Sequence, residues 1–346
     1  MDRLQLLRFT SDYMEGAHPA ILQRLAETNM VQAAGYGCDE FCAAAREKIR
    51  TACAVPDAEV HFLAGGTQTN MTVISAMLRP YQGVVAAETG HIALHEAGAI
   101  EHGGHKVLAL PAADGKLTAA AVAACLDAYA DDENRDHMVM PGMVYVTHPT
   151  ECGTLYTRAE LTAISELCRA HGVPLFLDGA RLAYALGCAA NDVTLADIAR
   201  LTDVFYIGGT KCGALLGEAV VFPQPDTVPH FFSIIKQNGA LLAKGRLLGI
   251  QFDTLFTEGL YERCGAHATH AADRIRAALR AHGYRFAWET PTNQIFLALT
   301  ALERARLEQH VRIDFWEKLS DETTVMRIAT SWATRTEDVD RLIAAL

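Results

Sequence analysis

Three short segments of the chain place polar side chains directly after runs of apolar residues. Gly66 and Thr67 precede a helical pattern, so their turn offers backbone N–H groups and a hydroxyl group to a phosphate. Asp178 supplies a carboxylate, and the guanidinium of Arg181 follows three residues later. Lys211 supplies an amine beside small residues, and a partly desolvated lysine can attack a carbonyl carbon.

Each of these segments also has an ordinary structural interpretation. Gly-Gly-Thr before a helix is often only a turn and an N-cap, an aspartate near an arginine is often a simple ion pair or a helix cap, and most lysines are solvated. Together, however, the three segments offer a phosphate cradle, an acid for a pyridine nitrogen and an amine for an aldehyde. These are the three attachments that pyridoxal phosphate requires, so we predict a site for this cofactor.

The elements that must position these residues are short apolar runs separated by helical stretches. Several runs are apolar at consecutive positions, which is typical of strands covered on both faces. We therefore predict an α/β fold with a mostly parallel seven-stranded sheet and helices on both faces, in which the ligand lies beyond the carboxyl ends of the strands. The seven predicted strands lie at 60–66, 83–88, 106–112, 143–149, 174–180, 203–209 and 219–223.

The pattern of the chain changes after about residue 230, where long helices replace the regular series of strands. We predict a large cofactor-binding domain at 1–254, which begins with a helical segment, and a small C-terminal α+β domain at 255–346. Amphipathic helices are predicted at 18–29 and 39–53, and further strands at 284–290, 294–300 and 324–330.

Composition limits the classes of partner and compartment. The 346 residues are 50% hydrophobic and carry a net charge of −11, which disfavours nucleic acid and anionic membranes and favours a small-molecule partner. The nine cysteines are scattered, as in proteins of a reducing compartment, and the charged N-terminus does not resemble a signal peptide. We therefore expect a cytoplasmic protein. Cys264, His267 and His270 do not match a zinc pattern, so no metal is expected.

The ordered set of motifs resembles the pyridoxal-phosphate enzymes of the aspartate-aminotransferase-like fold, also called fold type I. Within them it resembles the family of low-specificity L-threonine aldolases and β-eliminating lyases, and the likeness covers almost the whole chain. The matching segments are Phe-Thr-Ser-Asp at 9–12, Gly-Tyr-Gly-Cys-Asp at 35–39, Gly-Thr-Gln-Thr-Asn at 66–70, Gly-His at 90–91, Glu-Ala-Gly at 96–98, Asp-Gly-Ala-Arg at 178–181, the Lys211 segment and Met-Arg-Ile-Ala-Thr at 326–330.

The resemblance implies a role in cofactor binding for five matching residues. Lys211 would bind the cofactor aldehyde covalently, and Asp178 would pair with the protonated ring nitrogen. Gly66 and Thr67 would bind the phosphate. His91 would stack on the ring and could also act as an acid or a base.

The resemblance also implies how the substrate and a second subunit would take part. Ser11 and Arg327 would hold the amino-acid carboxylate, and Arg181 would lie near the cofactor's ring oxygen or the same carboxylate. Family members are usually tetramers in which a neighbour completes the site, so a homotetramer is expected, with the dimer as the smallest active unit. Lys236 is the candidate for a phosphate contact across that interface.

One loop departs from the family pattern. Many threonine aldolases have a histidine near the substrate β-hydroxyl in a loop that resembles residues 147–153 here. Alignment on Gly153 puts Glu151 at that place and His148 three residues earlier. The group that accepts the hydroxyl proton is therefore open between Glu151, His148, His91 and a bound water.

The activity implied by the resemblance is retro-aldol cleavage of L-threonine, L-allo-threonine or related β-hydroxy-α-amino acids to glycine and an aldehyde. Two alternatives stay open from the sequence: a pyridoxal-phosphate-dependent β-eliminating lyase, and a protein that binds the cofactor without turnover.

Overall fold

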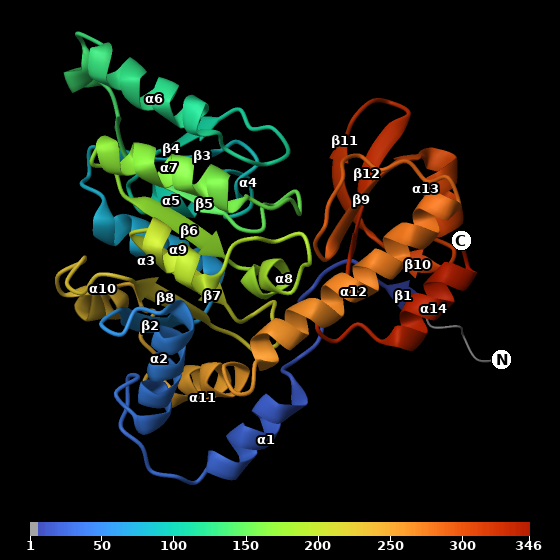
Figure 1. Ribbon diagram of the computed structural model, residues 1–346, viewed down its shortest axis with the longest axis horizontal. Coiled ribbons are helices and arrows are strands. Elements are labelled where there is room, and N and C mark those ends of the chain that lie inside the picture. Colours follow the sequence, from blue (N-terminus) through green and yellow to red (C-terminus); the bar gives the residue numbers. More distant parts are fainter. Residues whose placement is uncertain (1–5) are drawn as a thin grey trace.

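A seven-stranded sheet forms the centre of the computed structural model, which describes residues 6–346 (Figure 1). The strands follow the order β2-β8-β7-β6-β5-β3-β4, and only β8 runs antiparallel to its neighbours β7 and β2. The mostly parallel sheet predicted from the sequence is confirmed. The strands are β2 (Glu59–Leu63), β3 (Gln82–Ala87), β4 (Val107–Leu110), β5 (Met140–Thr147), β6 (Leu175–Gly179), β7 (Val204–Gly208) and β8 (Glu218–Phe222).

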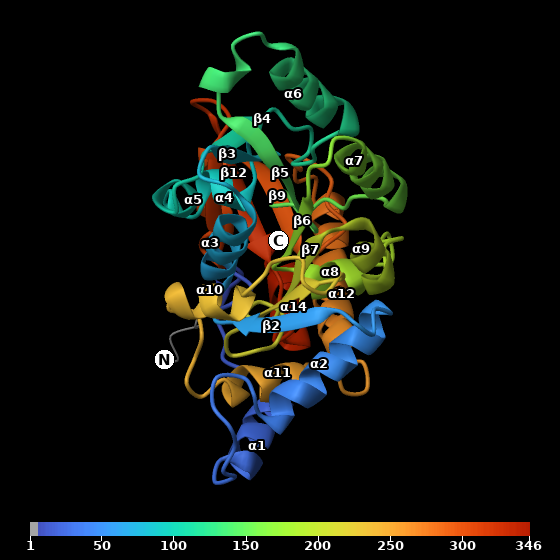
Figure 2. The ribbon, with the colours of Figure 1, turned by 90° about the vertical axis from the view of Figure 1, so that its left-hand side faces the viewer.

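Helices cover both faces of this sheet (Figure 2). One face is packed by α3 (Gly66–Met77), α4 (His91–Leu94), α5 (Ala99–His102) and α10 (Phe231–Gln237). The other is packed by α2 (Glu40–Cys53), α6 (Ala119–Asp131), α7 (Arg158–Ala170), α8 (Leu182–Leu186), α9 (Leu195–Leu201) and α11 (Arg246–Leu255). A short 3₁₀ turn, η1 (Arg135–His137), precedes β5.

Alternation along β6 shows why several strands of this sheet are apolar at consecutive positions. Leu175 and Leu177 enter the core beneath α7 and α9, whereas Phe176 enters the core beneath α3. Successive side chains of a strand point to opposite faces, and both faces are covered, so both sets are buried. Asp178 comes two residues after Phe176 and therefore projects toward the α3 face, at the carboxyl end of the strand.

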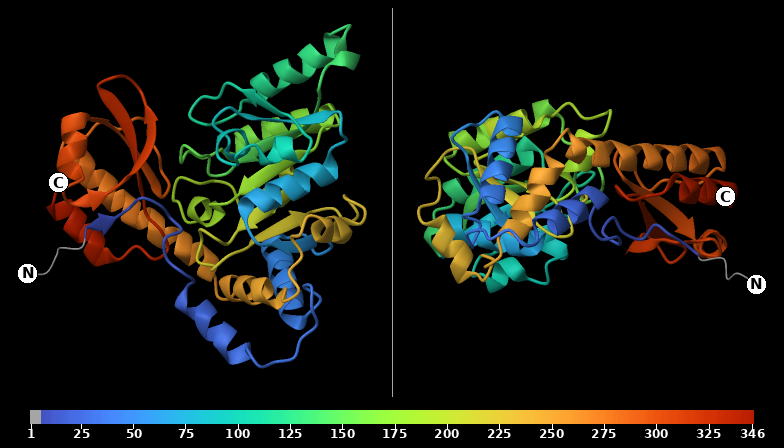
Figure 3. Two further views of the ribbon diagram at one scale, coloured as in Figure 1. Left: turned by 180° about the vertical axis from the view of Figure 1, so that it is seen from behind. Right: turned by 90° about the horizontal axis from the view of Figure 1, so that it is seen from below.

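The C-terminal part contains an antiparallel sheet in the order β11-β12-β9. The long helix α12 runs from the large sheet to this part (Figures 1 and 3). The strand predicted at 284–290 is wrong: only Phe286 forms an isolated bridge there, and β11 is the third strand. The elements are α12 (Leu260–Ala281), β9 (Gln294–Thr300), α13 (Ala301–Leu307), β11 (Asp314–Lys318), β12 (Thr323–Ala329) and α14 (Thr336–Ala344).

The N-terminal segment joins the two parts. Strand β1 (Leu7–Arg8) pairs in parallel with β10 (Val311–Arg312) of the C-terminal part, and the chain then returns to α1 (Pro19–Thr28) beside the large sheet. The helices α1 and α2 lie where the sequence predicts them. The domain boundary between residues 254 and 255 stays a prediction. None of the helices in residues 6–346 has the length and apolar character needed to span a bilayer.

Candidate active site

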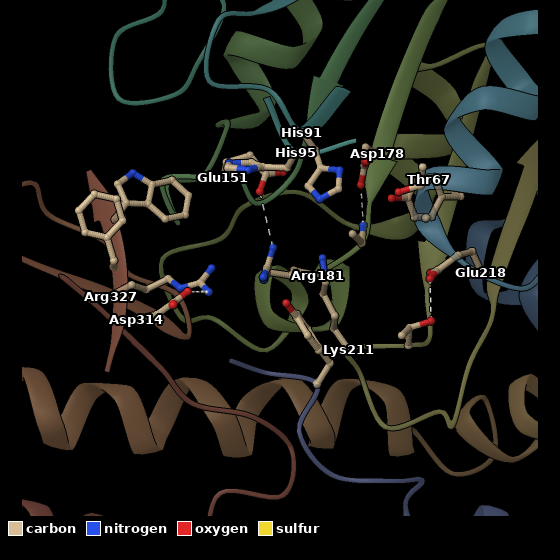
Figure 4. Close-up of a pocket in the computed structure, with 17 residues that line it drawn as sticks. Thr67, His91, His95, Glu151, Asp178, Arg181, Lys211, Glu218, Asp314 and Arg327 are labelled. Carbon is tan, nitrogen blue, oxygen red and sulfur yellow. Dashed lines mark hydrogen bonds and ion pairs between the residues drawn. The ribbon is translucent and has the colours of Figure 1, made fainter. Parts of the chain in front are cut away.

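A cavity of about 590 Å³ opens at the carboxyl ends of the parallel strands, facing the C-terminal sheet (Figure 4). This is the position that the doubly wound fold predicts for a ligand. Most of the predicted site residues line it. They are Gly66, Thr67, His91, Glu151, Asp178, Arg181, Lys211 and Arg327.

Asp178 is held at the end of β6 by three hydrogen bonds. The Tyr145 hydroxyl donates to its Oδ2 atom at 2.5 Å, and the Asn70 side-chain amide donates to the same atom at 3.1 Å. The Ala180 backbone N–H donates to Oδ1 at 2.9 Å. Burial and the neighbouring Asp178 charge raise the pKa of Tyr145, so this hydroxyl keeps its proton and acts as the donor. The carboxylate is therefore fixed in one orientation at the cavity wall.

Lys211 follows β7 and reaches the same cavity as Asp178. Its amine makes no hydrogen bond or ion pair within residues 6–346, and it lies 6.0 Å from the ring centroid of Tyr13. The loop that carries the lysine is held by Glu218, which accepts the Gly209 backbone N–H at 3.1 Å and the Thr210 hydroxyl at 2.8 Å. The loop is therefore fixed, and the lysine amine is free to react with a group in the cavity.

The turn before α3 forms the part of the cavity wall beside Asp178 (Figure 4). Gly65 is the N-cap of this helix and provides no side-chain cap, so the first N–H groups of α3 stay available at its positive end. A Cβ atom at Gly66 would lie 3.3 Å from the Tyr206 hydroxyl oxygen, which leaves little room for a larger residue. Thr67 adds a hydroxyl group to this wall.

A buried ion pair surrounds Arg181. Its Nε and Nη2 atoms donate to the two carboxylate oxygens of Asp12 at 2.6 and 3.1 Å, and Nη1 lies 3.7 Å from Glu151. Burial would raise the pKa of Asp12, but the charges of Arg181 and Lys211 hold it at about 2. Asn293 also donates to Asp12, at 3.0 Å. Arg181 therefore lines the cavity with its charge already matched by two carboxylates.

Arg327 reaches the cavity from β12 in the C-terminal sheet. Its terminal nitrogens donate to the Gln294 side chain at 3.1 Å, to Asp314 at 2.7 Å and to the Thr10 carbonyl at 3.1 Å. Its Nε atom is buried and has no hydrogen-bond partner among residues 6–346. The guanidinium charge of Arg327, which lines the cavity, makes this end of the cavity suitable for an anionic group.

Three residues predicted for the site do not line the cavity. His148 is fully buried, and burial lowers its pKa to about 4, so the structure does not place it as a base for a ligand. Ser11 is half-buried and accepts the Tyr13 backbone N–H at 3.4 Å; Tyr13 lines the cavity in its place. Lys236 lies on α10, away from the cavity of its own chain.

Several cavity residues escaped the sequence reasoning. Trp316 and Phe315 come from β11, a strand that the sequence analysis missed. Glu218 opens an apolar strand and gives no signal of its own. Asn70 and Glu96 do not line the cavity but contact residues that do; they belong to segments that match the family, and that match was the only available signal for them.

The fold and the cavity residues together define the class of protein to which this chain belongs. The chain matches the structure of aspartate aminotransferase from Thermus thermophilus with a TM-score of 0.71 over 99% of this chain and 91% of the other. At 15% identity this similarity shows the aspartate-aminotransferase-like fold alone.

The chain belongs to the beta-eliminating lyase family, whose model matches residues 8–329. Two relatives are low-specificity L-threonine aldolases: that of Pseudomonas aeruginosa is 33% identical over 308 residues (86% of each chain), and that of Pseudomonas sp. strain NCIMB 10558 is 32% identical over 311 residues (87% of each). A solved structure of Leishmania major threonine aldolase matches at a TM-score of 0.94 and 47% identity, over 98% of each chain.

Proposed function

We propose that this protein is a pyridoxal-phosphate-dependent lyase that cleaves L-threonine, L-allo-threonine or related β-hydroxy-α-amino acids to glycine and an aldehyde. The observation that carries the proposal is the Lys211 amine, which makes no hydrogen bond or ion pair within residues 6–346 and lines the same cavity as Asp178. The threonine aldolases among its relatives support this choice of reaction.

The cavity residues fit pyridoxal phosphate on three counts. The uncapped start of α3 at Gly66 and Thr67 suits a phosphate group. The oriented carboxylate of Asp178 suits a protonated pyridine nitrogen, and the Lys211 amine suits an aldehyde. When bound, this cofactor supplies a conjugated ring that takes up the electron pair released when a bond at the substrate Cα breaks.

The chain's own residues would hold and orient the substrate. Arg327, which lines the cavity from β12, would bind the substrate carboxylate through its guanidinium group. Arg181 would contribute less to this contact, since Asp12 and Glu151 already surround it. Anchoring the carboxylate at one end of the cavity decides which bond at Cα stands perpendicular to the ring, and hence which bond breaks.

Two of the three side chains predicted as candidate bases line the cavity. Glu151 lies at the wall after β5, and His91 lies at the start of α4. We propose that one of them accepts the β-hydroxyl proton as the carbon–carbon bond breaks. Separate Glu151→Gln and His91→Asn variants distinguish them: the variant that lacks the base loses cleavage of threonine, with a fall in kcat of at least about 100-fold.

We also propose a cytoplasmic homotetramer with the dimer as its smallest active unit, in which Lys236 contacts the cofactor phosphate of a neighbour. All nine cysteines are unpaired in the structure, which supports a reducing compartment. Lys236 Nζ lies 4.4 Å from the ring centroid of Tyr36, which is exposed in the single chain. Mixing inactive Lys211→Ala chains with inactive Lys236→Ala chains should restore activity, because a mixed dimer contains one intact site.

Product analysis tests the reaction. The protein loaded with pyridoxal phosphate is incubated with threonine, and we expect acetaldehyde and glycine. Ammonia and 2-oxobutanoate would instead indicate a β-eliminating lyase. No product from any member of a panel of β-hydroxy-α-amino acids would refute both and indicate a binding protein.

A further inference from the structure

His91 is held by a carboxylate that does not itself line the cavity. Its Nδ1 atom lies 2.8 Å from Oε1 of Glu96, whose side chain is completely buried. A carboxylate only accepts hydrogen bonds, so the shared hydrogen belongs to His91 Nδ1. The other ring nitrogen, Nε2, is then the one that is free to serve the cavity, where Figure 4 shows the ring among the lining residues.

The same carboxylate is linked to Asp178 through one amide group. The Asn70 side-chain nitrogen donates to Glu96 Oε1 at 2.7 Å and to Asp178 Oδ2 at 3.1 Å. Both carboxylates are buried and share a single neutral donor, and the second Glu96 oxygen has no hydrogen-bond partner among the described residues. Two like charges at such close range favour a positive charge nearby, and the imidazole of His91 provides it.

The backbone after Glu96 turns sharply to place this residue. Ala97 has φ +52° and Gly98 has φ +74°, so two successive residues adopt the left-handed conformation. This conformation is unfavourable for alanine, and such residues persist only where the surrounding structure holds them. The turn separates α4, which carries His91, from α5 and brings Glu96 back beneath it.

We propose that Glu96 is a positioning residue for His91: it fixes the hydrogen on Nδ1, directs Nε2 to the cavity, and with the Asn70-linked Asp178 makes proton binding by His91 depend on the charge of the whole cluster. The part of this inference that concerns catalysis rests on the proposed function; the part that concerns the proton does not.

The electrostatics agree with this arrangement. Burial lowers the pKa of His91. The hydrogen bond to Glu96 and the charge of Glu151 raise this pKa by more, so that it lies above its usual value. The titratable groups that face His91 come from every neighbouring element. They are Glu96, Glu151, Asp178, Lys211 and His95.

The first test isolates the charge of Glu96. In Glu96→Gln the amide oxygen can accept both hydrogen bonds, from His91 and from Asn70, so only the negative charge is removed. The pH dependence of His91 ethoxyformylation, followed by peptide mass spectrometry on the full-length protein, reports the neutral imidazole. We expect the midpoint to move to lower pH in Glu96→Gln and, by a smaller amount, in Asp178→Asn. An unchanged midpoint in Glu96→Gln overturns the proposal.

The second test asks whether the proton on His91 matters to the reaction. In the loaded enzyme, Glu96→Gln should move the acidic limb of the kcat/KM profile to lower pH and reduce kcat about 10- to 100-fold, with little change in KM. Glu101→Gln, a change at an exposed residue of α5, should change neither, and its profile is the control. If Glu96→Gln shifts the ethoxyformylation midpoint of His91 but leaves the pH profile of kcat/KM unchanged, the positioning role is refuted. If the wild type does not cleave the substrate, but the ethoxyformylation midpoint of Glu96→Gln still lies below that of the wild type, only the proposed reaction is refuted.

Discussion

Glu218 offers a direct test of the electrostatics of the cavity. Its side chain is 3% exposed, and burial raises its pKa from the usual 4.5 to about 8. The hydrogen bonds from Thr210 and Gly209 and the charge of Lys211 act in the opposite direction but are outweighed. The carboxyl group is therefore neutral in the folded protein at neutral pH, whereas it is ionised in the unfolded chain.

The sign of the pH dependence follows from these two values. Because the folded protein binds this proton more tightly than the unfolded chain, the stabilisation is complete below pH 4.5 and is lost as the pH rises to about 8. The slope is at most about 1.4 kcal/mol per pH unit, and the loss is at most about 5 kcal/mol. Glu218→Gln is neutral at every pH, so its stability lacks this slope. The hydrogen-bond acceptor that it gives up lowers its stability by an amount that does not vary with pH.

The assay is urea unfolding of the wild type and Glu218→Gln at intervals between pH 5 and 9, at one protein concentration. The free energy of unfolding of the wild type should fall relative to that of the variant across this range and become parallel above about pH 8. Glu133→Gln, a change at an exposed carboxylate, provides the control and should run parallel to the wild type. Parallel curves for Glu218→Gln would show that Glu218 is ionised in the folded protein and would refute the reasoning.

Further predictions concern the cofactor and the core. Lys211→Ala should abolish the imine absorbance of the loaded protein, as measured by its visible spectrum, while the protein stays folded by circular dichroism. Pyridoxal phosphate should dissociate more readily as the pH passes about 8, where Glu218 becomes negative near the phosphate cradle; fluorescence titrations at several pH values should show this loss of affinity, and its absence in Glu218→Gln. Asp12→Asn removes the nearer of the two carboxylates that pair with the buried Arg181 guanidinium, leaving only Glu151 at 3.7 Å, and should lower the free energy of urea unfolding by about 3–5 kcal/mol. Phe176→Ala removes a fully buried side chain from the core beneath α3 and should cost about 3–5 kcal/mol in the same assay.

The large sheet could be predicted from the sequence because its strands are buried on both faces. A run such as that of β7, from Val204 to Gly208, is apolar throughout, and the polar residues that come after Gly209 mark the carboxyl end of the strand. Asp178 lies at the carboxyl end of β6 and Lys211 follows the adjacent parallel strand β7. A parallel sheet brings such positions to one edge, so this could be predicted without any knowledge of side-chain contacts. The Gly66 turn reaches this edge too, as predicted.

The remaining parts of the site depend on contacts between residues far apart in the chain. Glu218 reaches the Lys211 loop because β8 pairs antiparallel with β7, opposite Gly208, and the apolar pattern of β8 contains no sign of this direction. Asn70 contacts Glu96 and Asp178, which are 26 and 108 residues away in the sequence. Hydrophobic periodicity reports which face of an element is buried, but it does not report which polar partners meet there.

The position of the substrate relative to Lys211 depends on how the C-terminal sheet is held against the large sheet. Lys211 is on the large sheet, whereas Arg327 belongs to β12. Asp12, from the segment that follows β1, accepts hydrogen bonds from Arg181 at the end of β6 and from Asn293 just before β9. This completely buried carboxylate therefore joins three separate segments at the cavity. A buried charge tolerates little displacement of its partners, so the Asp12 cluster fixes the distance between the group that would bind the substrate carboxylate and the amine that would react.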